Sequence, residues 1–218
     1  MSRTTLHGLE RWSRFLPLPE RKALLAQAVK FGLDVDLDLA FEESPSQPPE
    51  VEIFNAFVRQ CEDLVFFEMR PISVESDSSG PYEQVIAWDT DGDVEWKVQI
   101  RSSGVAIVLD SEGWPEEADL LEWILNVVVV QFVLEPPYRL TTFAAADVPP
   151  PEGAGAFQRL NLPATQAPLV QPKFYFLENV LAFSDMANSR HEFWVGSKDA
   201  AGLEVAKSKL VSHGFTPY

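Results

Sequence analysis

The chain has 218 residues, of which 33 are acidic and 17 are basic, giving a formal net charge of -16, and 46% of its residues are hydrophobic. This apolar fraction is typical of a globular protein and excludes an intrinsically disordered one. The length predicts one large domain or two small ones. The single cysteine, Cys61, excludes an internal disulfide and a zinc site built from several thiolates.

The apolar segments are short and interrupted. Arg3, Arg11 and Arg14 lie where a secretion signal would need an unbroken apolar core. The longest apolar run, residues 124–134, falls short of the roughly 20 residues that span a bilayer. We therefore expect a cytoplasmic protein that does not enter membranes.

Charge is distributed unevenly along the chain. Residues 1–31 carry six basic and two acidic side chains, residues 32–135 carry 24 acidic and four basic ones, and residues 136–218 are balanced. An acidic surface opposes nucleic acid and anionic lipid, which bind through lysine and arginine. It attracts a basic protein and speeds their encounter. The alternative is a solvated surface that only keeps the protein soluble.

The predicted elements begin with two amphipathic helices, over residues 6–16 and 19–31, where apolar side chains recur at helical spacing. Residues 33–41 then alternate strictly between apolar and other side chains, which predicts a half-buried strand. Its exposed face would carry a row of three aspartates, Asp34, Asp36 and Asp38.

A proline-rich linker or turn at residues 44–50 precedes a predicted helix over residues 51–61 and a strand over residues 64–69. Next, strands at residues 82–88 and 94–101 flank Asp91-Gly92, a dipeptide that favours a two-residue hairpin turn. A further strand at residues 105–109 extends the hairpin into an antiparallel meander.

The pattern turns helical over residues 115–132, with acidic side chains in the first turn. Its apolar surface is broader than one stripe, so we expect this helix to be central and covered on more than one side. The β-branched valines at 127–130 leave its second half open between helix and strand.

The last third of the chain predicts a strand at residues 138–143, then a connection rich in proline, glycine and alanine. Short strands follow at residues 174–177, 180–183 and 191–195, with a helix at 198–212. The expected fold class is α+β, with an antiparallel sheet around residues 64–110 packed with helices and a C-terminal strand-and-helix unit. The expected organisation is a domain at 1–145, a connection at 146–172 and a unit at 173–218 that is either separate or part of the same domain.

No cofactor, metal or catalytic motif is evident. Asp34, Asp36 and Asp38 have the spacing of calcium ligands, but Leu39 and Pro45 stand where a calcium loop needs glycine and glutamate. The three histidines do not pair at helical spacing, and no phosphate-binding loop or nucleophile elbow occurs. We therefore predict no metal and no cofactor.

The predicted hairpin turn combines carboxylates with aromatic side chains. Neighbouring like charges cost free energy unless a cation or partner offsets them, and aromatic residues are enriched in interface cores. The alternative is that Trp88 and Trp96 are core residues. The predicted partner-binding residues are Asp34, Asp36, Asp38, Trp88, Asp89, Asp91, Asp93, Glu95, Trp96 and Trp114.

These patterns predict a non-catalytic acidic protein that binds a basic protein, by analogy an inhibitor of the immunity-protein kind that covers the active site of a basic toxin or enzyme. One alternative is a chaperone or adaptor for a secreted effector, with the helix around residues 124–130 partly exposed. The other is a hydrolase that uses a pair of carboxylates, for which residues 116–122 offer candidates.

Overall fold

The structure is a computed structural model. It describes residues 9–39, 47–61, 64–73, 82–89, 91–92, 94–100, 106–110, 118–135, 138–153, 156–162, 172–187 and 190–218. In this part of the chain four α-helices accompany a five-stranded and a six-stranded sheet, each antiparallel throughout. The α+β class predicted from the sequence is confirmed.

The first two α-helices are α1 (Leu18–Leu33) and α2 (Pro49–Gln60), and each begins with a proline in its first turn. Proline suits this position because the amide hydrogen it lacks would have no partner there. The predicted helix over residues 6–16 is wrong in its described part, where only a 3₁₀-helix, η1 (Leu9–Arg11), is followed by turns. Pro17 disfavours a helical conformation at the preceding residue, so a helix cannot continue from here into α1.

The predicted strand over residues 33–41 is also wrong in its described part. Leu33 ends α1, Asp34 follows in the left-handed conformation with φ 59°, and residues 35–39 form no strand. The alternation nevertheless has a structural counterpart, because Leu37 is buried while Asp36 and Asp38 are exposed. The backbone of Asp38 is held by a side chain instead of a neighbouring strand: Gln60 donates to its carbonyl oxygen at 3.0 Å and accepts from its amide at 2.8 Å.

The first sheet contains β1 (Phe67–Met69), β2 (Tyr82–Asp89), β3 (Glu95–Ile100), β4 (Ala106–Asp110) and β5 (Ala118–Asp119), in chain order across the sheet. The predicted hairpin and meander are confirmed. Gly92 adopts φ 75° in the turn between β2 and β3, and Trp88 pairs with Glu95 while Ala87 pairs with Trp96. Paired residues share a face of the sheet, so this register decides which side chains enter the core.

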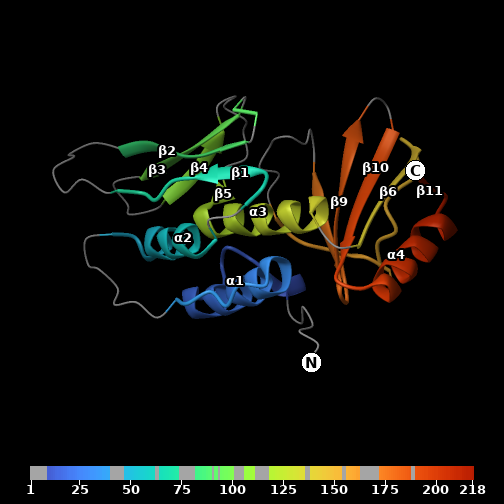
Figure 1. Ribbon diagram of the computed structural model, residues 1–218, viewed down its shortest axis with the longest axis horizontal. Helices are drawn as coiled ribbons and strands as arrows, with labels where there is room; N and C mark the ends of the chain where they lie inside the picture. The colour runs from blue at the N-terminus through green and yellow to red at the C-terminus, as the bar shows by residue number, and fades with distance from the viewer. Residues whose placement is uncertain are drawn as a thin grey trace.

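Helix α3 (Leu120–Leu134) is the centre of the molecule. Every residue from Leu120 to Val133 is buried. Figure 1 shows it between the first sheet, above, and helices α1 and α2, below. It also contacts β9 and β10 of the second sheet. The predicted central helix is confirmed from Leu120 onward, and it continues through the four valines. Its predicted start is wrong at residues 118–119, which form β5 instead, and residues 115–117 lie outside the described residues. Among the described residues, no helix is both long and apolar enough to cross a membrane.

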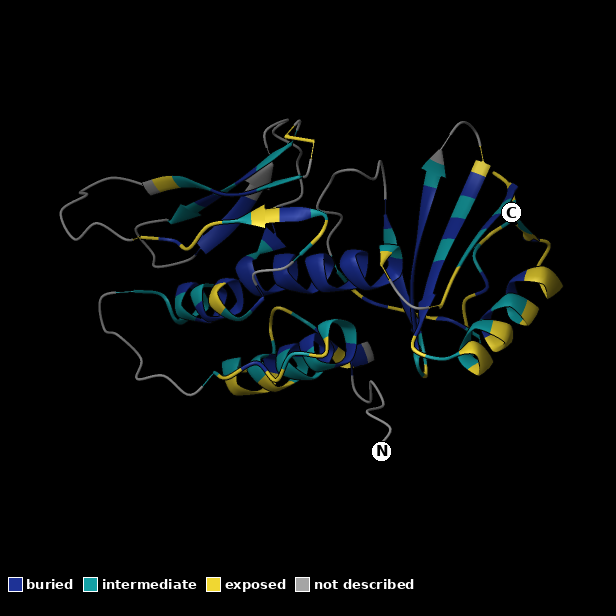
Figure 2. Cartoon of the chain, viewed as in Figure 1, coloured by how far each residue is buried: buried dark blue, intermediate teal, exposed yellow. Residues whose placement is uncertain are grey.

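The second sheet has the order β11-β6-β10-β9-β8-β7. Its strands are β6 (Tyr138–Ala145), β7 (Gln158–Arg159), β8 (Lys173–Leu177), β9 (Val180–Ala187), β10 (Arg190–Ser197) and β11 (Thr216–Pro217). One face packs on α3 and the other is covered by α4 (Ala200–Ser212), which gives a second small core (Figure 2). Because β6 pairs with β10, the sheet takes strands from both sides of the predicted connection at 146–172.

Candidate functional site

The predicted acidic residues lie in two separate places. The segment with Asp34, Asp36 and Asp38 runs beside α1, below α3 in Figure 1, whereas the turn between β2 and β3 lies at the opposite side of the molecule. The structure therefore does not bring the aspartate row and the hairpin turn together. Asp93 and Trp114 lie outside the described residues.

The two predicted tryptophan anchors of the hairpin face opposite sides of the first sheet. Trp96 is only 2% exposed and packs between Phe67 and Trp123, at ring-centre distances of 5.5 and 6.0 Å. It is a core residue and offers no surface to a partner. Trp88 is half-buried on the outer face, across the strand from Glu95. The sequence contained the signal for this difference, since a hairpin centred on Asp91-Gly92 pairs residue 88 with 95 and 87 with 96.

On the outer face, Trp88 lies in a row that crosses three strands. Glu68 of β1 and Glu95 of β3 are its direct neighbours in register. The indole nitrogen of Trp88 donates to Glu95 Oε1 at 3.3 Å, and the guanidinium of Arg70 lies 4.5 Å from the indole ring centre. Lys97 lies 3.9 Å from Glu95. The Trp88 surface, defined as Glu68, Arg70, Trp88, Asp91, Glu95 and Lys97, combines an aromatic ring with solvent-exposed charges.

The carboxylates of the hairpin turn have different roles. Asp89 Oδ1 accepts a hydrogen bond from the Val94 amide at 2.9 Å, which closes the turn. Asp91 is exposed beside Gly92. Turn chemistry thus accounts for Asp89, whereas Asp91 and Glu95 present carboxylates to solvent as members of the Trp88 surface.

The aspartate row is partly neutralised by lysines of the same chain. Lys30 lies 2.8 Å from Asp36 and 3.9 Å from Asp34, and Lys198 lies 3.8 Å from Asp34. The hydrogen bond to Asp36 raises the pKa of Lys30, which burial alone would lower. These ion pairs are solvent-exposed and contribute little to stability. They do reduce the negative field that the row offers to a partner.

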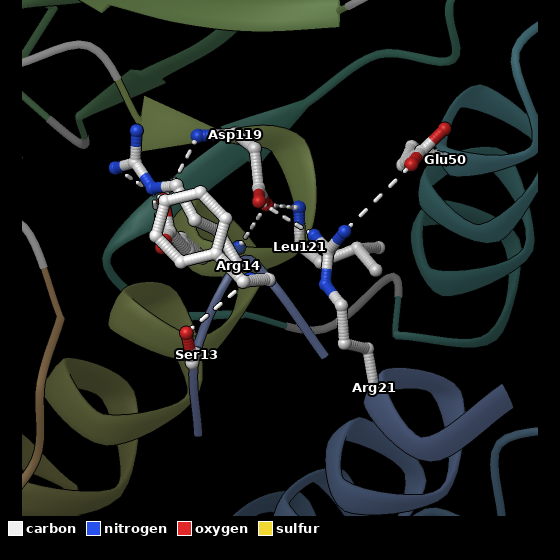
Figure 3. A network of polar contacts seen from close by, with 8 residues as sticks. Ser13, Arg14, Arg21, Glu50, Asp119 and Leu121 are labelled. Carbon is white, nitrogen blue, oxygen red and sulfur yellow. Dashed lines mark hydrogen bonds and ion pairs between the residues drawn. The ribbon is translucent and has the colours of Figure 1, made fainter. Parts of the chain in front are cut away.

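A third group of charges, which the sequence analysis did not predict, joins the basic N-terminal region to the start of α3 (Figure 3). Asp119 accepts from the amides of Leu121 and Glu122, and Glu122 accepts from the Asp119 amide, which forms a capping box. Arg14 donates to both Glu122 oxygens, at 3.2 and 2.9 Å, and Arg21 binds Asp119 at 2.6 Å. The Asp-x-x-Glu spacing was the available signal for the cap.

Burial has the largest effect on Glu122 and raises its pKa, with the charge of Asp119 acting in the same direction. The Asp119 amide and Arg14 oppose this rise by favouring the ionised carboxylate. Asp119 and Glu122 are thus engaged by helix capping and by arginines. The two described carboxylates of the cluster at 116–122 therefore already have partners within the chain.

Comparison with protein-family models, curated proteins and solved structures found no match to this chain. Among the described residues, no group of three or more histidine, cysteine, aspartate or glutamate side chains has an arrangement that could hold a metal ion. Among the described residues, the Trp88 surface combines accessible carboxylates with a half-buried tryptophan. It is the best candidate for the predicted contact with a basic protein.

Proposed function

We propose that this chain is a non-catalytic binding protein that captures a basic protein through the Trp88 surface, in the manner of an inhibitor or immunity protein. The observation that carries the proposal is Trp88, a half-buried tryptophan on the outer face of the first sheet between two carboxylates. Tryptophan and arginine are the residue types most enriched among the side chains that dominate binding energy.

Two physical effects act together at this surface. Glu68 is highly exposed, and Asp91 and Glu95 are also accessible to a partner. Their negative field raises the association rate with a cationic protein, an effect that salt screens. Trp88 supplies apolar area that slows dissociation once water is excluded. Arg70 and Lys97 lie beside the carboxylates and restrict which arrangements of positive charge fit.

The other predicted contacts support this choice of surface. Trp96 is enclosed in the core, and Asp34 and Asp36 lie near lysines on the other side of α3. Residues 124–130 of α3 are buried, so the partly exposed helix of the adaptor alternative is not present.

The test uses the full-length chain as bait in a lysate of its native host at low salt, followed by kinetic measurements with the captured protein. We compare Trp88→Ala, and the triple variant Glu68→Gln, Asp91→Asn, Glu95→Gln, with the unchanged chain. The triple variant should slow association several-fold, and Trp88→Ala should mainly speed dissociation. Added salt should slow association of the unchanged chain but affect the triple variant less.

A charge-matched control removes three exposed carboxylates elsewhere, with Asp147→Asn, Glu178→Gln and Glu204→Gln. This control should leave the kinetics close to those of the unchanged chain. The proposal fails if the control slows association as much as the triple variant does, or if the captured protein binds Trp88→Ala as tightly as the unchanged chain. Association that does not slow with added salt would also contradict the proposal.

A further inference from the structure

A pocket of about 380 Å³ lies among the C-terminal ends of α1, α2 and α3. Leu33, Val35, Leu64 and Phe132 give it apolar walls, and Cys61 and Glu135 also line it. Its volume is at the lower end of the range for small-ligand sites, which suits one long side chain better than a large cofactor. The segment that carries Asp34, Asp36 and Asp38 forms one of its walls through Val35.

Hydrogen bonds hold the walls of this pocket in place. Gln60, which lines it, binds the backbone of Asp38 through both ends of its amide. Gln131 is 3% exposed, accepts from the Phe66 amide at 3.3 Å and donates to the carboxylate of Glu135. The Glu135 carboxylate is therefore held by a buried amide in the lining of the pocket, whose walls are partly polar and partly apolar.

The charges of the pocket have one sign. Burial raises the pKa of Cys61 to about 12, so its thiol is neutral at physiological pH. Glu135 is exposed, and among the described residues no lysine or arginine lies within ion-pair distance of it. Asp34 and Asp36 are partly neutralised by Lys30 and Lys198, and among the described residues that line the pocket Glu135 is the one with a carboxylate.

We propose that this pocket binds one lysine or arginine side chain of a basic polypeptide, with the aliphatic stem between Leu33 and Phe132 and the cationic group at Glu135. Long basic side chains combine an apolar stem with a charged end, which matches apolar walls and one fixed carboxylate. The pocket lies away from the Trp88 surface, and the inference does not depend on the proposed function.

The test uses the full chain labelled with ¹³C at cysteine, because Cys61 is its only cysteine and reports directly on the pocket. N-acetyl-lysine amide, N-acetyl-arginine amide and the uncharged N-acetyl-norleucine amide are titrated in turn. At least one of the two cationic probes should shift the Cys61 signal saturably, with a Kd at least about tenfold lower than that of norleucine amide. The lysine and arginine arms show which cationic group fits.

The variant Glu135→Gln should weaken the better cationic probe at least about fivefold and leave the norleucine probe unchanged. The control Glu204→Gln, on α4, should leave both unchanged. Equal binding of cationic and uncharged probes would overturn the proposal, as would unchanged binding to Glu135→Gln. No saturable shift with any probe would also overturn it. Glu135 is exposed, so a melting curve for Glu135→Gln should match that of the unchanged chain.

Discussion

Trp88 and Trp96 show how position within a hairpin assigns different roles to the same residue type. Trp96 packs against Phe67 and Trp123, while Trp88 contacts Arg70 and Glu95 on the outer face. The alternation of Trp96 and Val98 with Glu95, Lys97 and Gln99 already indicates the inward side of β3. Grouping both tryptophans in one binding surface ignores the register of the predicted hairpin, which places residues 88 and 96 on opposite faces of the sheet.

The two tryptophans should therefore differ in their effect on stability. Trp96→Ala leaves a cavity in the core and should lower the free energy of unfolding by about 3–5 kcal/mol. Trp88→Ala removes a half-buried ring and should cost about 1 kcal/mol. Urea denaturation followed by circular dichroism measures both. Equal losses for the two variants would mean that Trp88 supports the fold as much as Trp96 does.

Glu122 should stabilise the folded protein more at acidic pH than at neutral pH, which is the reverse of what a carboxylate in an ion pair usually does. Because burial raises its pKa in the folded state, the folded protein takes up a proton more readily than the unfolded chain. Its contribution is fully present below the ordinary value of about 4.5 and is lost as the pH rises through the folded pKa. The unchanged chain should therefore gain stability relative to Glu122→Gln as the pH falls from neutral.

Removal of Arg14 offers a second check on the same carboxyl group. Arg14 lowers the pKa of Glu122, so Arg14→Met should move this gain in stability to higher pH. Arg11→Met, on the exposed η1 side chain nearby, serves as the control. Unfolding in urea from pH 7 to pH 4.5 measures the effect. A pH dependence for Arg14→Met that matches that of Arg11→Met would contradict this account of Glu122.

At the scale of elements, the four α-helices and the meander could be predicted, whereas the helix predicted over residues 6–16 and the strand predicted after α1 were wrong in their described parts. Alternation reports which side chains are buried, and residues 35–39 do alternate. A strand also requires a neighbouring backbone, and here the Gln60 side chain takes that place at Asp38. By contrast, the broad apolar surface of α3 predicts a central helix despite its valines. Contacts with both sheets stabilise this helix, which intrinsic propensity alone disfavours.

Asp34 ends α1 in the left-handed conformation, with φ 59°. Asparagine tolerates this conformation well, whereas a β-branched side chain does not. Asp34→Asn should therefore change stability by less than about 0.5 kcal/mol, while Asp34→Val should cost about 1–2 kcal/mol. Thermal and urea unfolding of the two variants measure this difference. If the two lose the same amount, the backbone at this position is not what limits substitution.

At the scale of the whole molecule, ion pairs within the chain account for part of the uneven distribution of charge along the sequence. Arg14, Arg21 and Lys30, from the basic N-terminal region, pair with Glu122, Asp119 and Asp36 of the acidic middle region. Composition revealed the asymmetry, but the two arginine pairs join positions 108 and 98 residues apart and so leave no local pattern in the sequence. For the same reason the pocket among three helix ends could not be predicted, since its lining comes from distant segments.

The second sheet approaches α3 closely at Gly196. A Cβ atom there would lie 2.8 Å from the Phe132 carbonyl oxygen and 2.9 Å from the Val133 Cα, so backbone would have to move. Gly196→Ala should cost about 1–3 kcal/mol through this crowding. Gly92→Ala is the comparison, because its Cβ meets nothing within 4 Å and only its positive φ opposes substitution. Differential scanning calorimetry measures both, and a Gly196→Ala protein as stable as the unchanged chain would disprove the tight approach.

The enclosure of α3 has a consequence for how this protein is made. The strands β9 and β10, which complete its cover, emerge from the ribosome only after some forty-five to sixty further residues have been added beyond its end. Until then a nascent chain that has synthesised α3 carries a valine-rich surface with no permanent cover on one side. Co-translational folding can therefore finish only when the last third of the chain arrives, and premature termination between α3 and β8 would yield a fragment prone to aggregation.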